Sequence, residues 1–242
     1  MDTNARKVIC ALDTGDINEA LDITRRLATK VGAFKVGHAL TLPHGLDVLD
    51  RLRDAGAERI FLDLKFHDIP NSVALAVREA AKRGVWMITI HIAGGPAMIT
   101  AAAEEAKAYD DASAPLLVGV SVLTSLDEHV LRDFMGVPRT VEEHMVALSR
   151  TGCEHGLDGV VCSAHEVKAI RQAIGHSGVI VTPGIRLSTG ETHDQKRVGE
   201  ATQALADGSD YLVIGRALIN SPDVDQALEQ MGLVSALVEG DA

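Results

Sequence analysis

Residues 8–30 have the sequence VICALDTGDINEALDITRRLATK, a short apolar run followed by a longer segment of mixed polarity. The apolar run Val8–Leu12 is typical of a buried strand. In the segment Ile17–Lys30 the apolar residues recur at the spacing of an amphipathic helix. The stretch therefore predicts a strand followed by a helix, the repeating unit of an α/β protein with a parallel sheet.

Strand-like runs of this kind recur along the whole chain. Eight of them in 242 residues match a single (β/α)8 barrel, or TIM barrel, whereas a doubly wound sheet more often has fewer strands and a glycine-rich first turn. No linker or shift in composition divides the chain, so we expect one catalytic domain over residues 1–242. The predicted strands are Val8–Leu12, Ala33–Val36, Arg59–Leu64, Trp86–Ile90, Leu116–Val122, Gly159–Cys162, Val179–Thr182 and Tyr211–Ile214.

Segments of helical period lie between these runs, and several begin with proline or a capping residue. The segment Leu187–Lys196 is different, because it is rich in Ser, Thr, Gly and charge. We expect a mobile loop there, of the kind that closes over the mouth of a barrel. After the first helix, the predicted helices are Pro43–Ala55, Asn71–Arg83, Pro96–Ala108, Val141–His155 and Ala164–Ala173.

The composition excludes several classes of partner. The chain has 23 Lys and Arg against 34 Asp and Glu, a formal net charge of −11 that repels a phosphate backbone at long range. Aromatic residues make up 3%, too few for a base-stacking platform, so we expect no nucleic-acid partner. The three cysteines never form a CxxC pair, which argues against a disulfide framework and against a thiolate zinc site.

The first residues and the apolar runs indicate where the protein is located in the cell. The first residues lack the basic, apolar and small-residue phases of a secretory signal. No apolar stretch approaches the roughly 20 residues that a membrane helix needs. We therefore expect a cytoplasmic protein that makes no contact with a membrane.

Polar residues gather at the carboxyl ends of the predicted strands. Each one alone is typical of a solvated loop. In a barrel, however, all these ends open on one face, which holds the active site in nearly every enzyme of this fold. Taken together, the residues therefore favour a site. They include Asp13, Lys35, Asp63, Lys65, Asp68, His91, Ser121, Thr124, Arg186, Gly215 and Arg216.

The third predicted strand carries the most informative charges. Strand side chains alternate between faces, so Asp63 and Lys65 are expected to point the same way, about 7 Å apart along the strand. Leu62, Leu64 and Phe66 then point toward the helices. Charges that face a barrel interior are costly unless they are paired, which favours a functional role. The alternative is an ordinary Asp–Lys salt bridge at the barrel rim.

A second lysine lies at the end of the preceding strand. Lys35 is expected to reach the same space, so that Lys35, Asp63, Lys65 and Asp68 form an array of alternating cations and anions. A lysine flanked by carboxylates has a raised pKa, which disfavours the neutral amine of a Schiff base. Lys65 is thus predicted to act as a general acid.

The last two strands end in sequences suited to an anion. Gly215 and Arg216 follow the eighth strand, where barrels commonly bind phosphate through backbone N–H groups and the start of a helix. As a bare motif, Gly-Arg is as often an ordinary strand-to-helix turn. His91, at the end of the fourth strand, is expected to be a packing residue and not a base.

Residues 63–72, DLKFHDIPNS, resemble the signature D-x-K-x-x-D-I-P-x-T of the orotidine 5′-phosphate decarboxylase family, with Ser72 in place of the usual threonine. One departure is Glu200-Ala201, where relatives commonly have Thr-Pro, which affects only the start of a helix there. The resemblance extends over almost the whole chain. The other matching segments are Ala11–Asp13, Phe34–Gly37, Val122–Ser125, Thr182–Arg186, Asp194–Gln195 and Val213–Arg216.

The resemblance implies an activity: decarboxylation of orotidine 5′-monophosphate to uridine 5′-monophosphate (UMP) and CO2 in de novo pyrimidine biosynthesis, with no metal and no cofactor. It implies that Lys65 protonates C6 of the pyrimidine and that Asp63 faces the substrate carboxylate. Lys35 would hold the charged array and the ribose. Asp13 would bind a ribose hydroxyl, and Thr124 would contact the pyrimidine.

The resemblance also implies how the phosphate and a second subunit contribute. Arg186, Gln195, Gly215 and Arg216 would bind the phosphate, with Gln195 reaching from the mobile loop. Asp68, Ile69 and Ser72 would come from the neighbouring subunit of a homodimer, so that each site spans the interface.

Three other functions remain open from the sequence. A magnesium-dependent sugar-phosphate decarboxylase of the related barrel group also carries D-x-K-x-x-D, with its acids as metal ligands. A Schiff-base aldolase would use Lys65 as its nucleophile. A non-catalytic protein would bind a phosphoribosyl ligand without turnover. Lys35, Thr124 and the segment from Arg186 to Gln195 favour the nucleotide decarboxylase.

Overall fold

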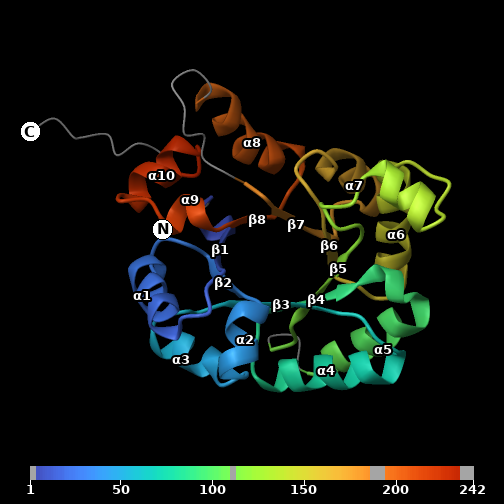
Figure 1. Cartoon of the computed structure of the whole chain (residues 1–242), viewed down its shortest axis with the longest axis horizontal. Helices are drawn as coiled ribbons and strands as arrows, with labels where there is room; N and C mark the ends of the chain where they lie inside the picture. The colour runs from blue at the N-terminus through green and yellow to red at the C-terminus, as the bar shows by residue number, and fades with distance from the viewer. Residues whose placement is uncertain (1–3, 110–112, 186–193, 235–242) are drawn as a thin grey trace, which may run out of the picture.

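Eight parallel strands close into a barrel in chain order, from β1 through to β8, which pairs with β1 again. The computed structural model describes residues 4–109, 113–185 and 194–234, with the backbone alone for residues 194–200. Figure 1 looks down this ring, with the helices packed around its outside. The strands are β1 (Val8–Leu12), β2 (Ala33–Val36), β3 (Ile60–Phe66), β4 (Met87–His91), β5 (Leu116–Val120), β6 (Gly159–Val161), β7 (Val179–Pro183) and β8 (Tyr211–Ile214).

The described helices follow the strands and complete the (β/α)8 pattern that the sequence predicts. A 3-10 turn, η1 (Ala5–Lys7), precedes β1, a second one, η2 (Ile92–Gly94), follows β4, and a π-helical turn, η3 (Val130–Phe134), lies between β5 and α6. The α-helices are α1 (Ile17–Leu27), α2 (His38–His44), α3 (Val48–Asp54), α4 (Pro70–Lys82), α5 (Pro96–Ala106), α6 (Val141–Glu154), α7 (Val167–Ile174), α8 (Asp194–Asp207), α9 (Arg216–Ile219) and α10 (Val224–Gln230).

The prediction of one helix over Pro43–Ala55 is wrong. Two short helices, α2 and α3, cover this part of the chain. Gly45 lies between them with a φ of 65°, a left-handed conformation that ends a helix and that glycine adopts without strain. Pro43 does not open a helix there but lies near the end of α2.

The expected loop at Leu187–Lys196 falls mostly outside the described residues, which resume at Asp194. Its last three residues form the start of α8, which begins at Asp194. The carboxyl end of the predicted loop is therefore wrong, because residues 194–196 are helical.

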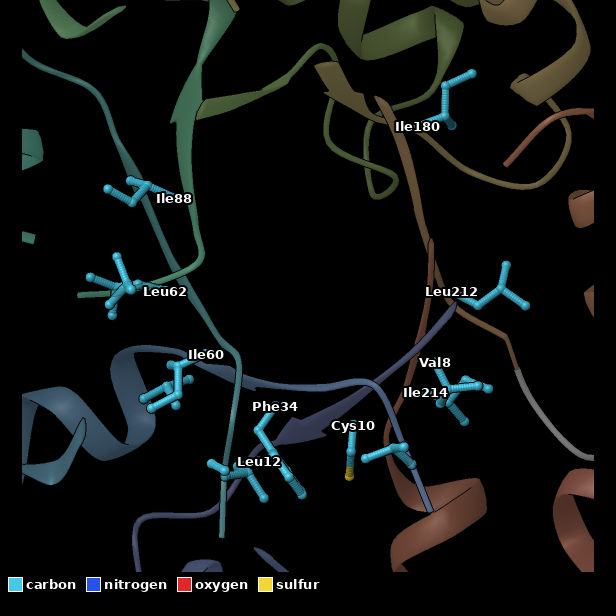
Figure 2. Packing of buried hydrophobic residues seen from close by; sticks show 14 of the residues in the cluster. Val8, Cys10, Leu12, Phe34, Ile60, Leu62, Ile88, Ile180, Leu212 and Ile214 are labelled. Carbon is cyan, nitrogen blue, oxygen red and sulfur yellow. The ribbon is translucent and has the colours of Figure 1, made fainter. Parts of the chain in front are cut away.

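Apolar side chains pack in two layers, one between the strands and the helices and one inside the barrel. Along β1, Val8, Cys10 and Leu12 belong to the outer layer, whereas Ile9 and Ala11 belong to the inner one. Figure 2 shows the outer set pointing away from the ring of strands. Strand alternation thus builds both layers, and their burial supplies the main driving force for folding.

One end of the barrel carries an aromatic and cationic cluster. Arg59, Trp86 and Tyr211 lie at the amino ends of β3, β4 and β8. The Arg59 guanidinium carbon lies 4.5 Å from the centre of the Trp86 ring, and Trp86 meets Tyr211 edge to face at 4.9 Å. Arg59 also donates hydrogen bonds to the carbonyls of Gly32 and Arg6. This cluster lies at the end of the barrel opposite the carboxyl ends of the strands, where the sequence predicts the site.

Among the described helices, none combines the length and the apolar character that spanning a membrane requires.

Candidate active site

The site begins with an irregularity in β3. Leu62 pairs with Ile88 of β4, but the next paired residue, Phe66, is opposite Ile90, so β3 has two extra residues between these pairs. Within the described part of the chain, Lys65 is the one non-glycine residue with a positive φ, 50°. Such a backbone conformation costs of order 1–3 kcal/mol and is found mainly at functional sites. Lys65 therefore reaches the barrel mouth from a bulged strand. The predicted sides of the strand are confirmed, because Leu62, Leu64 and Phe66 pack in the outer layer, whereas Lys65 contacts Asp63.

Four charged side chains meet at this mouth in alternating order. Lys65 Nζ lies 2.8 Å from Asp63 Oδ1, and Lys35 Nζ lies 3.4 Å from Asp63 Oδ2. Lys35 Nζ also lies 3.0 Å from Asp13 Oδ1. The side chains of Asp63 and Lys35 are 10% and 13% exposed, whereas that of Lys65 is 35% exposed. Of the two ammonium groups, that of Lys65 is therefore the more open to a ligand.

Asp63 stays ionised although it is buried. Burial alone raises the pKa of its carboxyl, but the ammonium groups of Lys35 and Lys65 oppose this effect. Hydrogen bonds from Lys65 Nζ and from the Thr89 hydroxyl lower the pKa further. The net result is a pKa of Asp63 below the usual range. The barrel mouth thus holds a fixed negative charge between two positive ones.

The second anion of the array is not the one that the sequence predicts. Asp68 is exposed, and its Oδ1 accepts a hydrogen bond from the backbone N–H of Ile69 at 2.6 Å. The described residues give Asp68 no ion-pair partner within the chain. Asp13 takes its place, at the end of β1 and in contact with Lys35. Within the described residues of a single chain, Asp68 is therefore not part of the array.

The end of β8 adjoins this array. A Cβ atom on Gly215 would lie 3.9 Å from Asp13 Oδ2 and 3.6 Å from the Cβ of Ala11. Arg216 follows as the first residue of α9 and is exposed. The first N–H groups of a helix have no partner within it, so an anion near Arg216 meets both backbone donors and a guanidinium.

The remaining predicted site residues are placed less completely. Thr124 is exposed in the segment after β5, and Ser72 is half-buried in the first turn of α4. Ile69, just before α4, is 67% exposed. Arg186 lies outside the described residues, and Gln195 lies in α8 with a side chain that is not described.

Sequence reasoning missed Thr89, on β4. Its hydroxyl is fully buried and bonds both Asp63 and the backbone N–H of Lys65. A signal for it exists, because a threonine in an otherwise apolar strand, two residues before the polar His91, falls on the same face as that histidine.

His91 lies near Lys65, half-buried, with its ring 5.2 Å from that of His67. Burial lowers the pKa of His91, and the nearby His67 and Lys65 lower it further. The imidazole is therefore held neutral at neutral pH, in keeping with a packing role.

The fold and the site together define a class of protein: a (β/α)8-barrel enzyme whose charged groups come from the ends of several strands. Comparison with known proteins narrows this class. Residues 6–231 match the model of the Orotidine 5'-phosphate decarboxylase / HUMPS family. The chain belongs to this family.

Several relatives match over nearly their full length. A protein of Syntrophotalea carbinolica named orotidine 5'-phosphate decarboxylase is 47% identical over 240 residues, which cover 97% of this chain and 98% of the relative. One of Dichelobacter nodosus with the same name is 46% identical, with 93% and 96% coverage. The crystal structure of orotidine 5'-phosphate decarboxylase from Lactobacillus acidophilus superimposes with a TM-score of 0.81 at 35% identity, covering 94% of this chain and 97% of that one.

Proposed function

We propose that this chain decarboxylates orotidine 5′-monophosphate to UMP and CO2 in pyrimidine biosynthesis, with Lys65 as the proton donor to C6 and without metal or cofactor. One observation carries the proposal: a buried, ionised Asp63 lies between two ammonium groups, of which Lys65 is the more exposed. The relatives' names support the same reaction, which makes the chain a carboxy-lyase.

The charges favour the transition state over the bound substrate. With the substrate carboxylate beside Asp63, the two negative charges repel each other, and the repulsion falls as neutral CO2 leaves. The bonding electron pair stays on C6, where the Lys65 ammonium attracts the growing negative charge. A proton then passes from Lys65 Nζ to C6 and gives UMP. Interactions that strengthen only along this path are the ones that raise kcat.

The rest of the substrate is bound away from C6. Gly215 and Arg216 at the start of α9 are suited to the phosphate, with Arg186 and Gln195 as its further ligands in this proposal. Gly215 lies close to Asp13, which in turn contacts Lys35. The ribose hydroxyls are proposed to bind to Asp13 and Lys35.

Phosphate binding at Arg216 contributes to catalysis because binding energy from a remote group can hold C6 against Lys65. Thr124, after β5, is proposed to contact the pyrimidine.

The proposal includes a homodimer that lends Asp68, Ile69 and Ser72 to the neighbouring site. Asp68 has a carboxylate that is open to solvent, and the adjacent Ile69 exposes 67% of its surface. An exposed isoleucine beside an exposed acid, at the start of α4, is suited to a subunit contact. In this arrangement Asp68 of the partner subunit would supply a further negative charge near Lys65.

The alternatives fit the geometry less well. A divalent cation ligated by Asp63 would have to displace Lys35 or Lys65, because each carboxylate oxygen already faces an ammonium group. Lys65 Nζ already donates a hydrogen bond to Asp63 Oδ1 at 2.8 Å, so a Schiff base at this lysine would have to break that ion pair. A binding protein without activity would have no need for a bulged strand that aims Lys65 at the ligand.

The test is the loss of orotidylate ultraviolet absorbance with purified protein in the presence of a chelator. We expect steady turnover at the same rate with and without the chelator. Turnover that requires magnesium would favour the metal-dependent decarboxylase. Tight UMP binding without any turnover would favour the binding protein, and borohydride trapping of substrate on Lys65 would overturn its role as a proton donor.

A further inference from the structure

The hydroxyl of Thr89 connects the two central residues of the site. Thr89 lies on β4 with no exposed surface. Its Oγ1 donates a hydrogen bond to Asp63 Oδ1 at 3.0 Å and accepts one from the backbone N–H of Lys65 at 2.9 Å. A hydroxyl has one proton and two lone pairs, so both bonds form at once without competition.

This contact lies where the strand pairing is interrupted. Between the pairs Leu62–Ile88 and Phe66–Ile90, β3 is out of register with β4. The Lys65 N–H falls in this gap, and it donates to the Thr89 side chain in place of a strand carbonyl. The same residue has the positive φ of 50°. The hydroxyl thus substitutes for a ladder hydrogen bond at the most strained residue of the site.

The contact also orients the carboxylate. Asp63 Oδ1 accepts hydrogen bonds from both Lys65 Nζ and Thr89, whereas Oδ2 faces Lys35. Rotation of the carboxyl group would break these contacts together. Thr89 therefore restrains both the acid and the backbone that carries the proton donor.

We propose that Thr89 is a positioning residue, which holds the Lys65 backbone in its left-handed conformation and fixes the Asp63 carboxylate between the two ammonium groups. This inference rests on the proposed function, because the positions it fixes are those of the groups that act at C6. Thr89 itself touches no substrate. Its contribution is expected to be large because misplacing a reacting group by about 1 Å can reduce the rate by as much as 10²-fold.

The experiment compares Thr89→Val, which keeps the branched shape and removes the hydroxyl, with Thr89→Ser, which keeps the hydroxyl. Thr24→Val is the matched control. Thr24 is also fully buried, but its hydroxyl donates a hydrogen bond to the backbone carbonyl of Ala20 within α1. For each variant, kcat and KM for orotidylate are measured together with UMP affinity by calorimetry and the thermal midpoint.

We expect Thr89→Val to lower kcat by about tenfold or more, with KM and UMP affinity changed by less than about threefold, because the hydroxyl acts on the chemical step and not on binding. Thr89→Ser should keep kcat within about threefold of the wild type, and Thr24→Val should keep it unchanged. A kcat of Thr89→Val within about twofold of the wild type, or an equal loss in Thr89→Ser, would overturn the inference. If Thr89→Val does not fold, Thr89→Ala gives the same comparison with Thr89→Ser.

A crystal structure of Thr89→Val tests the inference without reference to activity. We expect the Lys65 backbone to leave the positive-φ region, or the Lys65 Nζ to move out of hydrogen-bond range of Asp63 Oδ1, to a distance of more than about 3.5 Å. An unchanged Lys65 backbone and an unchanged ion pair would contradict the role of Thr89. If wild-type protein shows no decarboxylation, the proposed function fails, and this structure still decides the positioning role.

Discussion

Asp63 is the residue on which the site depends, because it is a buried carboxylate that the fold keeps charged. The cost of its burial is offset by Lys35, Lys65 and Thr89. Removal of either ammonium would leave a buried charge with too few partners, which is costly. The sequence pattern predicts the Asp63–Lys65 pair, because both residues lie in one short strand segment. It does not predict Thr89, whose contact with them depends on how β4 lies beside β3.

The lowered pKa of Asp63 predicts how stability depends on pH. The folded state binds fewer protons at this carboxyl than the unfolded state does, so the contribution is fully present above the unfolded pKa, about 4. It is lost as the pH falls through the folded-state value. The difference in free energy of unfolding between the wild type and Asp63→Asn should therefore be constant above about pH 5 and should shrink on further acidification. Urea unfolding at a series of pH values measures it, and a difference that grows on acidification would contradict the account.

At the scale of an element, β3 shows the limit of sequence reasoning. The bounds of β1, β2 and β8 agree with prediction, because a short, mostly apolar run bounded by polar residues or glycine is a local signal. The bulge in β3 cannot be predicted in this way, because it is defined by register against β4. The break at Gly45 is also missed, since the residues on both sides of it have helical character.

The bulge in β3 leads to a prediction about the backbone of Lys65 that does not depend on the charge of its side chain. Lys65→Gly and Lys65→Ala both remove the ammonium group, but only glycine adopts a positive φ without strain. We expect Lys65→Gly to be the more stable of the two, by about 1 kcal/mol, in urea unfolding. Equal stabilities, or a more stable alanine variant, would show that the left-handed backbone at Lys65 carries no strain.

In the whole molecule, the two ends of the barrel carry different kinds of residue. Arg59, Trp86 and Tyr211 pack together at the amino ends of the strands, and the carboxyl ends carry the charged array. Eight recurring βα units are enough to predict this architecture. A single chain nevertheless leaves Asp68 and Ile69 exposed, which the proposed homodimer would bring to a neighbouring site.

Mixing of variants tests the shared site. Lys65→Ala and Asp68→Ala subunits are each expected to be inactive as homodimers, because every site then lacks one group. In a mixed dimer, one of the two sites combines an intact Lys65 with an intact Asp68 from the partner subunit. We expect activity to reappear on mixing, toward about one quarter of the wild-type rate at random exchange. The estimate follows from half of the dimers having one intact site of two. No recovery despite demonstrated subunit exchange would contradict a site that spans the interface.

In the proposed reaction the Lys65 ammonium, held beside an ionised Asp63, donates the proton. The rate of orotidylate decarboxylation by purified Lys65→Ala protein tests this role, with UMP affinity measured on the same sample to show that the site remains folded. We expect kcat to fall by at least about 10²-fold, the lower range for a general acid, with UMP still bound. A Lys65→Ala protein that binds UMP and turns over orotidylate at close to the wild-type rate would contradict it.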